Sequence, residues 1–181
     1  MSTSARRPLA AVVGGQSASP ETLALAKALG QALIEQGLRV ATGGLGGVMS
    51  AASQGAREAP GWREGDVIGV LPGLDASTAN PYVDVAVPTG LNYARNTVLV
   101  AMGDVVIAIG GGAGTLSEIA LAWQHNKPVI ALLGTEGWGS RLAGAPLDAR
   151  RTDVIHGAES PHAAAILARS LVGSREVHRG F

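Results

Sequence analysis

The chain has 181 residues, which is enough for one α/β domain with a substantial core and cramped for two. Its 14 basic and 14 acidic residues cancel and only 3% of residues are aromatic, which argues against a nucleic-acid-binding protein, because such proteins need a basic surface or stacking rings. There is no cysteine, so disulfide bonds and thiolate metal sites are excluded, and a reducing cytoplasm is compatible with the sequence.

The apolar segments are short. A run such as residues 98–102 is far below the about 20 residues that a membrane-spanning helix needs. The first eight residues carry a basic pair without the apolar region of a signal peptide. We therefore expect a cytoplasmic protein without membrane contact, with one domain over residues 9–173 and flexible tails at residues 1–8 and 174–181.

Apolar segments alternate along the chain with segments of helical periodicity. Most of the apolar segments are followed by glycine or proline, which is typical of strands. The predicted strands are residues 9–13, 38–41, 66–71, 82–87, 105–109, 129–133 and, at an edge, 152–155. The predicted helices are residues 20–36, 48–57, 92–102, 113–124 and a closing helix that starts at Ser160-Pro161, with residues 134–150 irregular.

This alternation predicts an α/β fold with a doubly wound, mostly parallel sheet and helices on both faces. In such a sheet the ligand lies outside the carboxyl ends of the strands, near the point where the strand order reverses. Glycine clusters follow three predicted strands, at residues 14–15, 43–47 and 110–114. All three should lie along that edge, and together they predict a nucleotide-sized pocket lined by backbone.

The most informative of these loops lies within residues 104–119. A buried strand ends in three glycines, and Ala113, Gly114 and Thr115 then open a helix that carries Glu118. Such a turn presents bare backbone N–H groups at the positive end of a helix dipole, where phosphate binds. Glycine suits this position because side chains would hold a phosphate away. We therefore predict an anion site here.

Several common nucleotide and catalytic motifs are missing. The G-x-G sequences at residues 44–46 and 112–114 lack the third glycine of the dinucleotide fingerprint, and no acidic residue closes the second strand. The P-loop pattern, G-x-S-x-G and H-E-x-x-H are absent, and the four histidines show no metal-ligand spacing. An NAD enzyme, a P-loop ATPase and a catalytic metal are therefore disfavoured.

Two charged residues are candidates for the chemistry. Glu118 lies one turn beyond Gly114 and Thr115, so its carboxylate can point toward the loop; it can equally be a first-turn acid that complements the helix dipole. Arg95 lies near the start of the preceding helix and is either a phosphate clamp or a surface arginine. The Thr115 hydroxyl either binds a phosphate oxygen or belongs to an ordinary helix residue.

Polar residues in neighbouring loops are secondary candidates. Ser17 follows the first strand and either touches the ligand or caps a helix. Asn92 and Asn96 either line the pocket or cap and solvate a helix, and Asn80 follows a long loop that leads toward the same edge. The apolar residues 98–102 are either a dimer surface or buried within the monomer.

The glycine loops resemble a known family. Residues 110–118, read as GGGAGTLSE, resemble the P-G-G-x-G-T-x-x-E signature of the LOG ("lonely guy") family, often misannotated as lysine decarboxylases. Residues 42–49 resemble the second glycine loop of that family, and the resemblance spans roughly residues 9–133. It implies a Rossmann-like homodimer or higher homo-oligomer. It also implies a phosphoribohydrolase that cleaves a nucleoside 5′-monophosphate such as AMP into base and ribose 5-phosphate.

The resemblance also implies roles for individual residues. Arg95 and Glu118 would be the catalytic pair, because a carboxylate can stabilise an oxocarbenium-like transition state while the arginine orients the phosphate or ribosyl end. No cofactor or metal would be required for this hydrolysis. The ligand- and phosphate-binding residues would be Gly14, Ser17, Gly43, Gly44, Asn96, Gly111, Gly112, Gly114 and Thr115.

Two departures from the signature favour a sister branch. Gly110 replaces the proline of the motif, and the M-H-x-R-K segment appears as NYARN at residues 92–96, which keeps only the arginine. These changes are similar to those of the molybdenum cofactor carrier proteins, which share the fold but carry an anionic pterin phosphate. The resemblance thus implies either hydrolysis of a nucleoside monophosphate or non-catalytic binding of the molybdenum cofactor or a related phosphorylated pterin.

Overall fold

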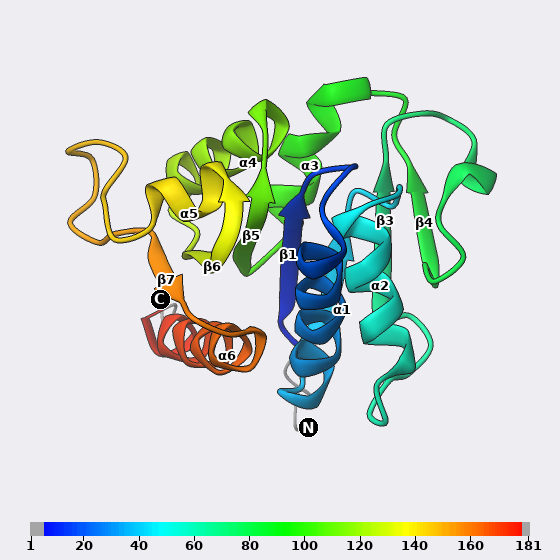
Figure 1. The fold of residues 1–181 in the computed structure, drawn as a ribbon, viewed down its shortest axis with the longest axis horizontal. Helices are drawn as coiled ribbons and strands as arrows, with labels where there is room; N and C mark the ends of the chain where they lie inside the picture. The colour runs from blue at the N-terminus through cyan, green and yellow to red at the C-terminus, as the bar shows by residue number, and fades with distance from the viewer. Residues whose placement is uncertain (1–5, 179–181) are drawn as a thin grey trace.

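The computed structural model describes the backbone of residues 6–178 and the side chains of residues 6–173, and it contains one seven-stranded sheet (Figure 1). The strands lie in the order β4-β3-β2-β1-β5-β6-β7, and every pairing is parallel. Their bounds are β1 (Leu9–Gly14), β2 (Arg39–Thr42), β3 (Val67–Leu71), β4 (Val85–Pro88), β5 (Val105–Gly111), β6 (Val129–Gly137) and β7 (His156–Ala158). The predicted doubly wound α/β fold is confirmed, and its strand order reverses between β1 and β5.

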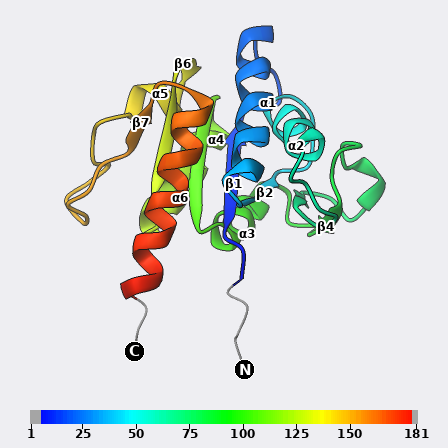
Figure 2. The ribbon, with the colours of Figure 1, turned by 90° about the horizontal axis from the view of Figure 1, so that it is seen from below.

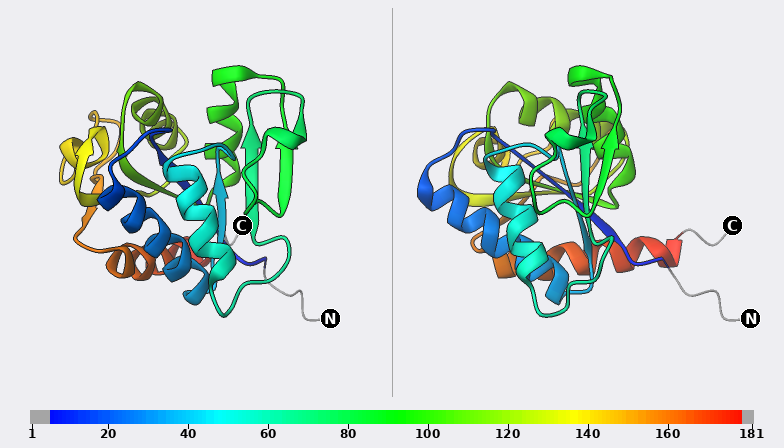
Figure 3. Two further views of the ribbon diagram at one scale, coloured as in Figure 1. Left: turned by 45° about the vertical axis from the view of Figure 1, so that its right-hand side comes forward. Right: turned by 90° about the vertical axis from the view of Figure 1, so that its right-hand side faces the viewer.

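Helices cover both faces of the sheet (Figures 1 and 2). One face is packed by α1 (Pro20–Glu35), α2 (Val48–Glu58) and α6 (Pro161–His178). The other is packed by α3 (Arg95–Met102), α4 (Ala113–Gln124) and the short α5 (Trp138–Leu142). Two 3₁₀ turns, η1 (Ala76–Thr78) and η2 (Asn92–Ala94), lie in the loops around β4. The views in Figure 3 show η2 beyond the carboxyl ends of the strands, whereas η1 lies beside β4.

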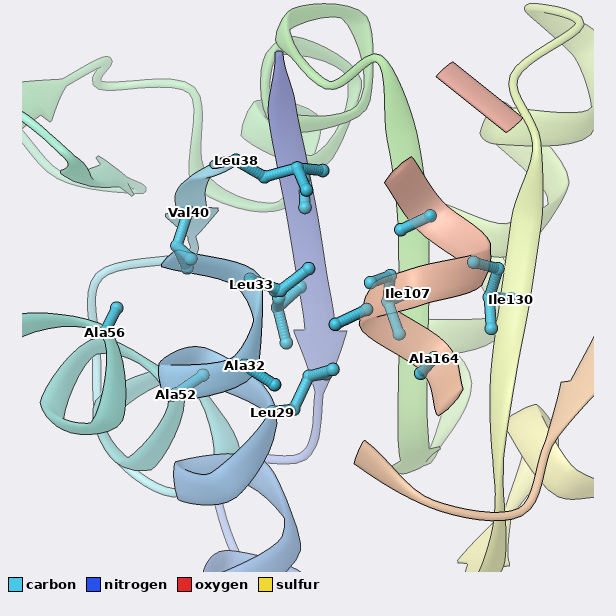
Figure 4. Close-up of a cluster of buried hydrophobic side chains, with 14 of the residues drawn as sticks. Leu29, Ala32, Leu33, Leu38, Val40, Ala52, Ala56, Ile107, Ile130 and Ala164 are labelled. Atoms are coloured by element: carbon cyan, nitrogen blue, oxygen red, sulfur yellow. The ribbon is translucent and has the colours of Figure 1, made fainter. Parts of the chain in front are cut away.

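Central strands are buried on both faces, which explains their unbroken apolar sequences. In β1, Ala10 and Val12 join the core under α1 and α6, whereas Ala11 and Val13 join the core under α3 and α4. The same alternation runs along β5, and Figure 4 shows Ile107 with Leu29, Leu33 and Ala164 in the first of these cores. Burial on alternate faces follows from the two-residue period of a strand.

The pair α1 and α2 packs backbone against backbone. A Cβ added at Gly30 would lie 2.0 Å from the Ala52 carbonyl oxygen, and one added at Gly55 would lie 1.8 Å from the Lys27 carbonyl oxygen. The small residues of α2 therefore let the two helices approach closely. This contact holds the N-terminal ends of α1 and α2 beside the loops that follow β1 and β2.

The structure corrects two predicted elements. The last strand is β7 (His156–Ala158) rather than residues 152–155, because the Ile155 backbone bonds Ala145 O at 3.0 Å and Gly144 N at 2.8 Å instead of a strand. The region 134–150 is not wholly irregular, since β6 continues to Gly137 and α5 follows. The apolar residues 98–102 pack mainly inside the monomer, where Leu99 and Val100 are fully buried.

The described backbone includes residues 6–8 and continues beyond residue 173. Arg6 pairs with Asp104 at 2.6 Å, and Arg7 pairs with the buried Asp66, so residues 6–8 are held against the sheet. At the other end α6 continues to His178, five residues beyond residue 173. The remaining tail residues, 1–5 and 179–181, lie outside the described part of the chain. Within residues 6–178 no helix combines the length and apolarity needed to cross a bilayer.

The close approach of α1 and α2 makes Gly55 sensitive to added volume. Gly55→Ala should lower the free energy of unfolding by about 3 kcal/mol, because the new methyl group forces the helices apart. The matched control is Gly173→Ala in α6, where a Cβ meets nothing within 4 Å; this variant should gain about 0.5–1 kcal/mol. Denaturant titration measures both changes, and equal stability of the two variants would contradict the proposed packing.

Candidate anion-binding site

A cavity of about 550 Å³ opens at the carboxyl ends of β1, β2 and β5, where the strand order reverses. This is the edge at which ligands bind in doubly wound sheets. The glycine clusters after all three strands contribute to it. The predicted residues in its lining are Gly14, Gly43, Asn92, Arg95, Asn96, Gly112, Gly114, Thr115 and Glu118.

Three predicted residues lie outside this lining. Ser17 and Gly111 line a neighbouring cavity of about 460 Å³ on the other side of the β1–α1 turn. Gly111 is covered on its inner side, since a Cβ there would lie 2.1 Å from Thr115 Oγ1. Gly44 turns toward β3, where a Cβ would lie 2.6 Å from Leu71 Cδ2, and its carbonyl accepts a hydrogen bond from Asn80 Nδ2 at 3.1 Å. These three residues support the loops around the cavity.

Sequence reasoning also missed part of the wall. Besides Val12 and Val13 of β1, the lining residues that were not predicted are Gln16, Leu45, Met49, Pro72 and Tyr93. Met49 lies in the first turn of α2. Tyr93 was within reach of sequence reasoning because it lies in the same NYARN segment as Arg95. Leu45, Met49 and Pro72 carry no chemical signature, and only the fold brings them to the cavity.

Three helices begin around the cavity without side-chain caps. The N-cap residues of α2, α3 and α4 are Gly47, Ala94 and Gly112. None of them has a side chain that accepts a hydrogen bond from a backbone N–H of its helix. By contrast, α1 is capped by Ser19 Oγ, which accepts from the Thr22 backbone N–H. Uncapped N-termini leave backbone N–H groups and positive dipole ends for an outside partner. The Val48 N–H of α2 donates to Gly15 O at 3.0 Å, however, and the Arg95 N–H of α3 donates to carbonyl groups of η2. The N-cap and first turn of α4 contribute Gly112, Gly114 and Thr115 to the cavity lining, so the N-terminus of α4 favours an anionic ligand in this cavity.

Arg95 and Glu118 form a buried ion pair inside this cavity. Arg95 Nη1 lies 3.2 Å from Glu118 Oε1, and the two side chains are 12% and 7% exposed. The pair depends on Gly43, where a Cβ would lie 2.4 Å from Arg95 Nη2 and 2.6 Å from Met49 Sδ. A bare backbone at Gly43 therefore leaves the room that the guanidinium occupies.

The environment of Glu118 changes its proton affinity. Burial raises the pKa of Glu118 from 4.5 to about 7, although the Arg95 guanidinium acts in the opposite direction. Desolvation prevails because the carboxylate loses water on almost every side while its ion pair is long for a charge-assisted bond. Near neutral pH the group can accept or donate a proton, which suits either acid–base chemistry or binding beside an anion.

Thr115 and Asn96 complete the polar wall. Thr115 is 3% exposed, and its hydroxyl has no hydrogen-bond partner among residues 6–173, so it is free to bind a ligand oxygen. Asn96 Nδ2 donates to Ser117 Oγ at 3.0 Å, and Ser117 Oγ donates to Gly114 O at 2.7 Å. This chain of hydrogen bonds fixes the start of α3 against the first turn of α4.

The raised pKa of Glu118 has a consequence for stability. The folded protein holds a proton that the unfolded chain releases above about pH 4.5, so the stability from this group is lost as the pH rises through about 7. Between pH 5 and pH 8 the wild type should therefore lose roughly 3 kcal/mol of unfolding free energy that the Glu118→Gln variant does not lose. The difference in stability between the two proteins should shift by that amount in favour of the variant. Urea titrations across this range measure the difference.

The control is Glu64→Gln, which removes an exposed carboxyl group far from the cavity lining. This variant should follow the wild-type pH profile. Parallel profiles for Glu118→Gln and the wild type would show that Glu118 is not desolvated.

The chain is similar to several known proteins. The molybdenum cofactor binding protein of the phototrophic bacterium Rippkaea orientalis is 40% identical, with a TM-score of 0.81 over 93% of this chain and 99% of that one. The molybdenum cofactor carrier protein of Chlamydomonas reinhardtii is 32% identical, with a TM-score of 0.77 over 92% and 99%. A cytokinin riboside 5′-monophosphate phosphoribohydrolase of Mycobacterium marinum is 32% identical over 68% of this chain and 72% of its own length.

These relatives confirm the resemblance to LOG-like and molybdenum cofactor carrier-like proteins that the glycine loops indicated. The model of the SLOG cluster4 family matches residues 7–165, which include every residue of the cavity lining. The chain therefore belongs to the SLOG cluster4 family.

Proposed function

We propose that the cavity binds a small phosphorylated ligand, and that this ligand is the molybdenum cofactor or a related phosphorylated pterin, held without breaking a bond. The observation that carries the proposal is that the uncapped N-terminus of α4, with Gly112, Gly114 and Thr115, lines the same cavity as the Arg95 guanidinium. The free Thr115 hydroxyl and the backbone at Gly112 and Gly114 would bind the phosphate. The cavity volume of about 550 Å³ lies in the range of small-ligand sites.

Two observations support binding without cleavage. The solved structures that match nearly the whole chain include proteins named for binding or carrying the molybdenum cofactor. The NYARN segment keeps Arg95 but lacks the Met, His and Lys of the corresponding M-H-x-R-K segment of the LOG family. In addition, burial raises the pKa of Glu118 to about 7, so this carboxyl group can be protonated near neutral pH. A neutral Glu118 does not repel a phosphate and leaves the Arg95 guanidinium to pair with it.

A second candidate is the hydrolysis of a nucleoside 5′-monophosphate to base and ribose 5-phosphate. The buried Arg95–Glu118 pair favours it, and so does the similarity to the M. marinum enzyme. In this mechanism ionised Glu118 stabilises positive charge developing on the ribose and positions the attacking water, while Arg95 holds the phosphate end. We also propose that the protein assembles as a homo-oligomer, and light scattering on the purified protein tests this assembly directly.

A retention experiment separates the two candidates. Purified protein is mixed with metal-free molybdopterin or with AMP and passed over a desalting column. The carrier function predicts that the pterin elutes intact with both the wild type and Glu118→Gln, and that AMP yields no more adenine with the wild type than with the variant. Adenine release that is lost in Glu118→Gln would establish hydrolysis instead. Failure to retain the pterin at micromolar concentration, together with no adenine release from AMP, would contradict both functions.

Gly43 tests the anion site without changing a charge. Gly43→Ala should weaken the binding of AMP and of molybdopterin about tenfold or more, because its methyl group displaces the Arg95 guanidinium. The control is Gly46→Ala in the same loop, where a Cβ meets nothing within 4 Å and affinity should be unchanged. Calorimetric titration measures both, and equal affinities would show that Arg95 does not contact the ligand.

A further inference from the structure

The cavity has two kinds of wall. The glycine loop, Thr115 and Arg95 make a polar side suited to a phosphate, whereas Leu45, Met49 and Pro72 are apolar. A free phosphate uses only the first kind of wall. An apolar wall beside an anion site fits a ligand whose other end is flat and uncharged.

Tyr93 stands at this apolar side and is almost fully exposed. Tyr93 is among the residues that line the cavity, and yet 90% of its surface is accessible to solvent. No side-chain hydrogen bond to Tyr93 occurs among residues 6–173. The other large rings differ: Trp123 is 1% exposed, and Trp62 donates from Nε1 to Asp84 at 2.9 Å. The fold therefore leaves Tyr93 without an internal packing role.

The backbone that carries this ring is fixed. Asn92 has a left-handed φ of 50°, and its N–H donates to Pro72 O at 3.0 Å. Thr89 Oγ1 donates to Leu71 O at 2.7 Å, which ties the preceding residues to the end of β3. A left-handed asparagine is strained enough to need such support and is often found at functional sites. Only the two side-chain torsions of Tyr93 remain to be ordered when the ring meets a ligand.

The position of Tyr93 in η2 couples the ring to the anion site. Arg95 follows it by two residues, at the first position of α3. One short segment thus supplies both a cation for a phosphate and a ring for a flat group. An aromatic ring stacks on any heteroaromatic system, and such stacking contributes measurably to affinity.

We propose that Tyr93 is a specificity-determining residue that stacks on the flat ring system of a ligand whose phosphate occupies the α4 end of the cavity. The proposal rests on the proposed function, since it concerns the ligand of that same site. It restricts the ligand to a phosphate ester that carries a planar heteroaromatic group, such as a pterin or a purine. Sugar phosphates and inorganic phosphate would bind through the polar wall alone.

The test compares probes that share a phosphate and differ in the ring. AMP and metal-free molybdopterin carry the ring, and ribose 5-phosphate does not. Tyr93→Ala should weaken the binding of both ring-bearing probes about tenfold or more and change ribose 5-phosphate affinity less than about twofold. Tyr93→Phe should retain wild-type affinity, because the ring is preserved. Leu74→Ala is the surface control, since Leu74 is 82% exposed and lies outside the lining.

The outcomes are distinct. Unchanged affinity of Tyr93→Ala for AMP and molybdopterin would overturn the role of Tyr93 and leave the proposed function standing. Equal weakening of all three probes would also overturn it, because the residue would then shape the phosphate site. A change of oligomeric state without a change of affinity would assign the ring to a contact between copies, and would overturn the proposal too. A wild-type protein that binds none of the probes would instead overturn the proposed function.

Discussion

The desolvated ion pair of Arg95 and Glu118 is the interaction on which the rest of the site depends. It joins α3 to α4 across 23 positions of sequence, with Nη1 and Oε1 3.2 Å apart. Two charges removed from water gain little net stability, and losing either partner leaves the other buried and unpaired. The structure surrounds the pair accordingly, with a bare glycine at position 43 and the Asn96–Ser117 hydrogen bond beside it.

The same pair links binding to protonation. An anion that enters the cavity meets the positive end of α4 and Arg95, but also Glu118. Because burial brings the pKa of Glu118 to about 7, protonation removes the repulsion at little cost near neutral pH. One geometry therefore serves two chemistries. A neutral Glu118 suits retention of a phosphorylated ligand, and an ionised Glu118 suits stabilisation of positive charge on a ribose.

The architecture explains why binding elements from distant parts of the chain meet. Parallel strands all end at one edge, so the loops after β1, β2 and β5 converge although about 30 to 60 residues separate them along the chain. The segment before α3 follows β4, the strand at one edge of the sheet. It returns past β3 and brings Tyr93 and Arg95 to the same cavity. One segment thus supplies both Arg95 and Tyr93, and the loop after β2 supplies both Gly43 and Leu45 to this cavity.

The local sequence by itself determined the order of the main strands and helices and the positions of the glycine loops. Continuous apolar runs predicted strands buried on both faces, glycine clusters predicted backbone-lined loops at their ends, and the GGGAGTLSE motif predicted the start of α4 with Glu118 one turn inside. Tertiary structure decided what local patterns do not encode. Gly111 and Gly112 are adjacent, yet the Thr115 side chain covers Gly111, and Gly112 lines the cavity. Residues 152–155 have strand-like composition, but Ile155 bonds the loop at residues 144–145 and the strand begins at His156. The direction of a side chain and the partner of a backbone group depend on neighbours distant in sequence, and packing alone selects among them.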